Sequence, residues 1–114
     1  MDKQSRREAV REYKERKAAP GIFAVRCTAS GEAWVGTSRN LEQQQNREWF
    51  ALKQGAHMNR ALRAAWRAHG EAAFSFEPLE VVDDEGLSAV MLDKRLKERA
   101  EHWREELGAT KIAG

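Results

Sequence analysis

The stretch GIFAVRCTASGEAWVG, residues 21–36, decides the fold of this chain. Its first half, Ile22 to Thr28, predicts a β-strand, and Ser30-Gly31 supplies a turn. A second short strand through Ala33-Trp34-Val35 is expected to end at Gly36. Ten residues separate Phe23 from Trp34, about the reach of one short hairpin. Corresponding positions of paired strands are neighbours, so Phe23 and Trp34 are expected to face each other or a common cleft.

Composition sets the limits on the class of protein. The 114 residues suit one domain with its own core, and 33% charged with 41% hydrophobic residues is a globular balance. No apolar run reaches the roughly 20 residues of a membrane span, and nothing resembles a secretory signal. The single cysteine, Cys27, is expected to be a buried hydrophobe. We therefore expect a cytoplasmic, bacterial protein without a membrane partner.

The remaining segments predict helices and one further strand. Residues 1–20 predict a charged helix ahead of a domain over 21–114. Apolar residues at helical spacing predict helices over about 40–54, 59–69 and 87–107. Residues 73–82 predict a third strand, in which Pro78 favours an edge position or a bulge. The predicted fold class is α/β: a small three-stranded antiparallel sheet flanked by helices, with an added N-terminal helix.

The order of short motifs along the chain resembles that of the GIY-YIG nuclease superfamily. Gly21-Ile22-Phe23 and Trp34-Val35-Gly36 stand where the family has its two signature tripeptides, each without its tyrosine. The further matching landmarks are Thr37 to Leu41, Gly55 with His57, Leu62 with Trp66, Gly70, and Phe74 with Phe76. The resemblance covers residues 21 to about 107 and identifies a divergent member with a degenerate active site.

The resemblance implies which positions would carry catalysis. Family members hydrolyse phosphodiesters with one divalent metal, Mg²⁺ or Mn²⁺, two tyrosines, an arginine and a metal-binding glutamate. These positions fall on Phe23, Trp34, Gln44 and Ala100. Phe23 has no hydroxyl, Trp34 offers only an N–H donor, and Gln44 carries no charge. Ala100 cannot bind metal, so no metal site and no cofactor are expected.

Neighbouring residues are candidates to replace the missing catalytic arginine and the missing metal ligand. Arg47, one turn after Gln44, is a candidate for the missing catalytic cation. Glu98 or Glu101 would be the nearest replacement for the metal ligand, although helical geometry places both well round the helix from position 100. If the enzyme reading is right, Mg²⁺ or Mn²⁺ would be the cofactor.

A row of cationic residues predicts a nucleic-acid surface. Arg60, Arg63 and Arg67 recur at spacings of three and four, and guanidinium groups suit phosphate contacts. Lys53 and His57 precede them and would extend the patch. The alternative is an ordinary solvated helix face. A net charge of +2 neither demands nor excludes a polyanionic partner.

Three hypotheses follow for the function. The first is a domain that binds nucleic acid, DNA in preference to RNA, with impaired or absent nuclease activity. The second is a divergent metal-dependent endonuclease. The third is a protein-interaction module or homodimer.

Overall fold

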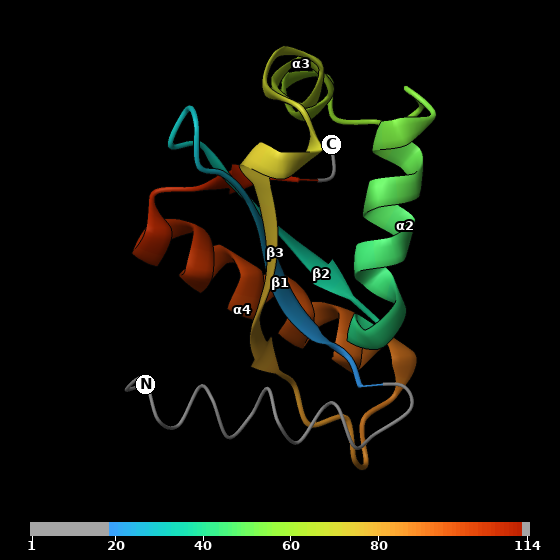
Figure 1. The fold of residues 1–114 in the computed structure, drawn as a ribbon. Coiled ribbons are helices and arrows are strands. Elements are labelled where there is room, and N and C mark those ends of the chain that lie inside the picture. Colours follow the sequence, from blue (N-terminus) through green and yellow to red (C-terminus); the bar gives the residue numbers. More distant parts are fainter. Residues whose placement is uncertain (1–18, 113–114) are drawn as a thin grey trace.

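The computed structural model describes residues 19–112, so the helix predicted within residues 1–20 lies almost wholly outside the described part. The elements, in chain order, are β1 (Gly21–Cys27), β2 (Ala33–Ser38), α2 (Leu41–Lys53), α3 (Arg60–His69), a 3-10 turn η1 (Glu71–Ala73), β3 (Phe74–Val81), α4 (Ala89–Leu107) and β4 (Thr110–Lys111). Figure 1 shows the helices arranged around one sheet. The predicted α/β class and the main helices are confirmed.

The sheet has four strands in the order β3-β1-β2-β4, so the prediction of three strands is wrong. The additional strand, β4, has two residues and runs parallel to β2. Gly108 ends α4 in the left-handed conformation at φ 61°, which turns the chain back toward the sheet. So short a segment has no alternation of apolar and polar residues, which explains why the sequence pattern did not reveal it.

Strand β3 lies at the other edge of the sheet and carries a bulge. Phe23 pairs with Pro78 while Ile22 pairs with Glu80, so the register shifts between these two positions of β1. Proline lacks the N–H of a ladder and is tolerated at edges and bulges. The expectation for Pro78 is therefore confirmed.

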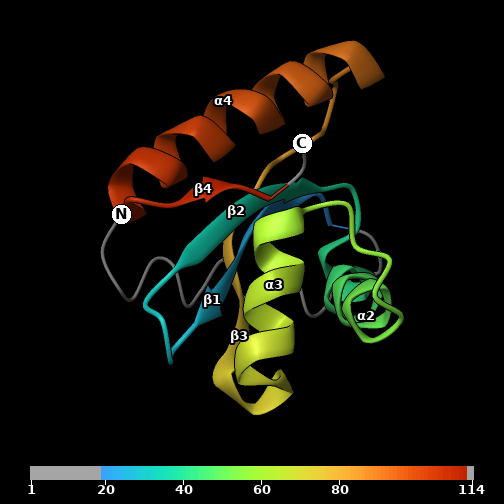
Figure 2. The ribbon, with the colours of Figure 1, turned by 90° about the horizontal axis from the view of Figure 1, so that it is seen from above.

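Alternation along β1 divides the core into two layers, one on each face of the sheet. Phe23, Val25 and Cys27 face a layer with α2 and α3, whereas Ile22 and Ala24 face α4. Figure 2 shows α4 on one side of the sheet and α2 and α3 on the other. Cys27 is buried, as expected. The central strand is thus apolar on both faces.

Strand β2 continues past Gly36 to Ser38, beyond the predicted end. Its pairing places Gly36 opposite Phe23 and Trp34 opposite Val25. Phe23 and Trp34 are each 1% exposed and belong to the same layer of the core. The two residues thus lie on one face of the sheet, as expected, but they pack into the hydrophobic core there and not around the expected cleft.

The helices begin and end within two residues of the predicted limits, and caps define two of their starts. The side chain of Asn59 accepts the Leu62 N–H at the start of α3, and that of Ser88 accepts the Met91 N–H at the start of α4. Within residues 19–112, no helix combines the length and the apolar character that crossing a membrane requires.

Candidate functional site

The two signature aromatic residues are part of the hydrophobic core. The ring of Phe23 stacks on Phe76 with centroids 5.1 Å apart, and that of Trp34 stacks on Phe74 at 6.4 Å. Both side chains are buried and offer no oxygen to a ligand. At these two positions the protein has buried apolar rings, where the resemblance implies tyrosine hydroxyl groups.

A chain of hydrogen bonds begins at the end of β2, at Ser38. The hydroxyl of Ser38 accepts the backbone N–H of Asn40 at 3.0 Å and donates to Gln44 Oε1 at 2.8 Å. Gln44 Nε2 then donates to Glu48 Oε1 at 2.8 Å, one helical turn along α2. Gln44, the position of the family's arginine, therefore has both amide atoms engaged inside the protein.

The Glu48 carboxylate also accepts a hydrogen bond from a second series of residues, Asn59 and His57. The Asn59 backbone N–H donates to His57 Nδ1 at 3.0 Å, and His57 Nε2 lies against Glu48 Oε2. Because Nδ1 accepts a hydrogen bond, the ring proton is on Nε2 and the imidazole donates to Glu48. His57 and Glu48 are 6% and 9% exposed, respectively.

Both carboxylate oxygens of Glu48 accept a hydrogen bond in this network. Gln44 supplies one carboxylate oxygen with a proton and His57 supplies the other, so both oxygens are satisfied. Asn59 links the network to the sheet edge, since its Nδ2 donates to the carbonyls of Lys111 and Ile112. We refer to Ser38, Gln44, Glu48, His57 and Asn59 as the Glu48 network; its contacts join α2, the start of α3 and β4.

Some residues of the Glu48 network have a different place from the one that the sequence predicts. His57 was expected in the nucleic-acid surface, but it is buried with both ring nitrogens engaged. Glu48 is not among the site residues predicted from the sequence. The nine-residue separation of the pair crosses a helix end and a loop, and no periodic pattern indicates such a contact.

A pocket lies on the other face of the sheet, between β2, β4 and α4. Its volume is about 460 Å³, within the range of roughly 300–1,000 Å³ usual for small-ligand sites. Its lining residues are Val35, Gly36, Thr37, Lys97, Ala100, Glu101, Arg104 and Lys111. Ala100, at the family's metal position, thus lines this pocket, while Phe23, Trp34 and Gln44 lie on the α2 side.

The residues of this pocket do not fit a divalent metal. Mg²⁺ and Mn²⁺ take oxygen ligands, and Glu101 is the one carboxylate in the lining. Ala100 offers no ligand atom. Across residues 19–112, no three His, Cys, Asp or Glu side chains are grouped as a metal site would require.

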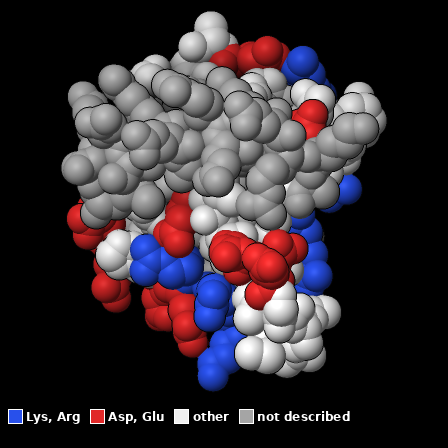
Figure 3. Space-filling model, turned by 90° about the horizontal axis from the view of Figure 1, so that it is seen from below, with Lys and Arg blue, Asp and Glu red and all other residues white. Residues whose placement is uncertain are grey.

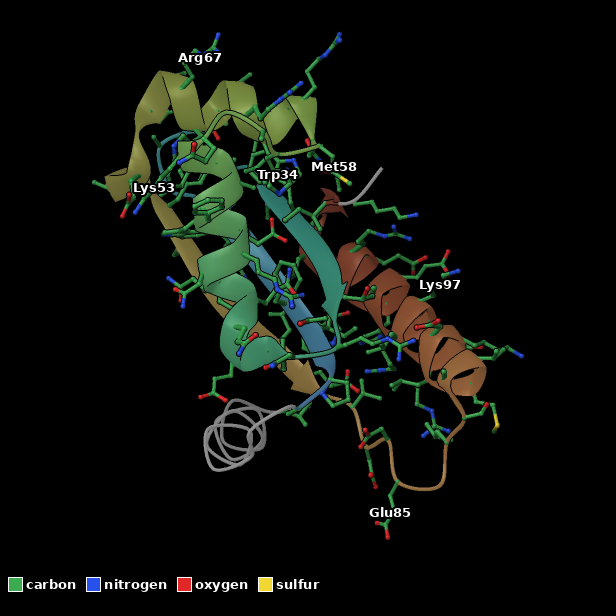
Figure 4. All side chains as sticks on the ribbon, turned by 90° about the vertical axis from the view of Figure 1, so that its right-hand side faces the viewer. Trp34, Lys53, Met58, Arg67, Glu85 and Lys97 are labelled. Atoms are coloured by element: carbon green, nitrogen blue, oxygen red, sulfur yellow. The ribbon has the colours of Figure 1, made fainter. Side chains whose placement is uncertain are left out.

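The remaining predicted residues lie on the surface of α2 and α3. Arg47, Arg60 and Arg67 are exposed, Arg63 is half-buried, and Lys53 pairs with Glu71 at 3.3 Å. Within residues 19–112, none of the four arginines has an ion-pair partner. Figure 4 shows Arg67 pointing outward from α3. Figure 3 shows another face, and in its part that is not grey, basic and acidic side chains are interspersed.

Comparison with solved structures agrees with the sheet and the helix positions: the chain has a GIY-YIG-like nuclease fold. One domain with this fold that the chain resembles is the catalytic domain of the intron endonuclease I-TevI. A point mutant of that domain aligns with a TM-score of 0.68 at 25% identity, covering 83% of this chain and 94% of that chain. The catalytic domain of the homing endonuclease I-TevI aligns with a TM-score of 0.67 at 24% identity, covering 83% and 99%. No protein-family model and no curated protein matches the sequence.

Proposed function

We propose that this domain binds nucleic acid through α3 and does not hydrolyse it. The observation that carries the proposal is the placement of charge. The four positions that match the family's catalytic residues are uncharged, as Phe23, Trp34, Gln44 and Ala100, whereas Arg60, Arg63 and Arg67 form a row on α3.

The three arginines share one side of α3 because their spacings of three and four follow the helical turn. Leu62 and Ala65 bury the opposite side of the helix against the sheet. Guanidinium groups held on a rigid helix present several fixed donors to phosphate oxygens. Such contacts give affinity for the backbone without selecting a base sequence.

The likeness to endonuclease domains supports nucleic acid as the ligand class. It also carries the expectation of DNA in preference to RNA, which a direct comparison of the two must test. Arg47, the candidate cation of a divergent endonuclease, lies exposed on α2, outside the Glu48 network.

The test is fluorescence-anisotropy titration of single- and double-stranded DNA and RNA over a series of salt concentrations. Two phosphate contacts, from Arg60 and Arg67, would contribute about 2 to the slope of log K against log salt. Arg60→Gln with Arg67→Gln should remove that contribution and weaken binding to all sequences alike. Lys94→Gln with Arg95→Gln on α4 is the matched control, since both variants lose two positive charges.

Three outcomes would contradict the proposal. Equal effects of the two double variants would show a response to net charge alone, and α3 would then be an ordinary solvated face. Cleavage of any substrate in Mg²⁺ or Mn²⁺, abolished by Arg47→Gln, would establish the divergent endonuclease instead. Absence of nucleic-acid binding together with a dimeric mass in solution would favour the interaction module.

A further inference from the structure

The pocket between β2, β4 and α4 has a strongly cationic rim above an apolar floor. Lys97, Arg104 and Lys111 contribute three positive charges, and Glu101 contributes one negative charge. Val35 and Ala100 form the floor and are 1% and 7% exposed. A cationic rim with an apolar floor is typical of a site for a ligand that has an anionic group and a less polar part.

Helical spacing and strand pairing bring the cations together. Lys97 and Arg104 are seven residues apart, two turns of α4, so they lie on the same side as Ala100. Lys111 belongs to β4, on the opposite side of the pocket from α4. It pairs with Val35 of β2, and the next residue, Ile112, donates its N–H to the Val35 carbonyl at 3.0 Å. Lys97 is exposed on α4 (Figure 4).

These cations are not neutralised by the rest of the described structure. Among residues 19–112, the ion pairs of α4 use Asp93 and Arg99, and none involves Lys97, Arg104 or Lys111. Three unpaired cations around one pocket create a local positive potential that attracts anions.

We propose that this pocket binds a phosphate monoester. Its net charge of +2 matches a monoester, which carries about −1.5 to −2 at neutral pH, better than a phosphodiester with its single charge. Thr37 adds a hydroxyl, and the volume of about 460 Å³ leaves room for an attached sugar beside the apolar floor. The monoester comes from one of two sources: the phosphorylated end of a nucleic-acid strand, or a free mononucleotide.

The strand-end source rests on the proposed function and deepens it. The Asn59 side chain, at the start of α3, donates to the Lys111 carbonyl, so Arg60 begins the arginine row next to β4. A strand whose terminal phosphate entered the pocket would have α3 close to its backbone. The mononucleotide source is independent of nucleic-acid binding.

The first measurement is an NMR titration of the full chain with thymidine 5′-monophosphate and, as control, thymidine. Saturable shifts at Gly36, Thr37 and Ala100 are expected with the phosphorylated compound alone. Lys97→Gln with Lys111→Gln should weaken binding about tenfold, because the variant lacks two of the three cations of the pocket. Both side chains are exposed, so their removal leaves the core intact. Lys94→Gln with Arg95→Gln, on the same helix, should not weaken it. Shifts that are equal with thymidine, or unaltered by loss of Lys97 and Lys111, would overturn the proposal.

The second measurement separates the sources and keeps this proposal distinct from the proposed function. Oligonucleotides of one sequence would carry a 5′-phosphate, a 3′-phosphate or only hydroxyl ends. Tighter binding of one phosphorylated end, lost in Lys97→Gln with Lys111→Gln, identifies the strand end. Thymidine monophosphate binding without any end preference identifies the mononucleotide. If the proposed function alone fails, no hydroxyl-ended strand binds while the monophosphate still does.

Discussion

Phe23 lies directly opposite Gly36 across the β1–β2 pair, and its ring occupies the space that a side chain at position 36 would need. A Cβ at Gly36 would stand 2.8 Å from Phe23 Cζ and 2.3 Å from Ile112 Cγ2. The second signature tripeptide thus ends in glycine because the core ring of β1 and the residue after β4 meet over it.

Gly36→Ala is expected to destabilise the fold by about 1–3 kcal/mol, since overpacking forces neighbouring groups to move. Urea unfolding measures the change. Ile112→Ala removes one of the two clashing groups, so the double variant should lose less than the sum of the single effects. Full additivity would contradict the contact between positions 36 and 112.

Restoring the first signature tyrosine is expected to reduce stability without creating a nuclease. Phe23→Tyr would place a hydroxyl in an apolar layer at a 1% exposed position, at a cost of about 1–3 kcal/mol. Phe76→Tyr is the matched control: its ring stacks on Phe23 but is half-buried, so a hydroxyl there has water within reach. A stable Phe23→Tyr variant with new cleavage activity would contradict this prediction.

Glu48→Gln is expected to destabilise the protein by about 1–3 kcal/mol, the usual cost of an unsatisfied buried polar group. The carboxylate accepts from Gln44 and from His57, whereas an amide has one oxygen and must turn its NH₂ toward one of these donors. Glu42→Gln, exposed on the same helix, removes the same charge and should cost only a few tenths of a kcal/mol.

The two variants would be compared by urea unfolding and by ¹⁵N NMR of the His57 ring. The unmodified protein should show the proton on Nε2, because Nδ1 accepts the Asn59 N–H. Equal stability of Glu48→Gln and Glu42→Gln would mean that the Glu48 network contributes nothing to the fold.

Trp103→Phe is expected to cost about 1–2 kcal/mol through one lost hydrogen bond and a smaller ring. Trp103 Nε1 donates to Glu80 Oε1 at 2.9 Å, and Arg99 Nε also donates to this oxygen at 2.8 Å. Glu80 therefore keeps a partner in the variant. In a Glu80→Ala background, which has no side-chain acceptor, the same substitution should cost less, and an unchanged cost would show that only packing matters.

Much of the architecture could be predicted from local pattern. The alternation in β1, the apolar spacing of α2, α3 and α4, and the position of Pro78 depend on interactions between near neighbours or on backbone chemistry. Motif spacing likewise placed Phe23 and Trp34 on one face. Such features are readable because periodicity and steric restriction act within a few residues.

Tertiary structure alone decided the remainder. Thr110 and Lys111 become a strand because Gly108 reverses the chain beside β2, and a two-residue segment carries no pattern of its own. Glu48 receives His57 because the loop between α2 and α3 folds back over the helix, a contact that no spacing rule specifies. The cationic pocket depends on the same principle: α4 and β4 supply charges that only folding brings to one place. The sequence by itself determined the longer elements and which side of each is apolar, because these follow from local physics. The short strand β4 and the sites depend on long-range packing between elements.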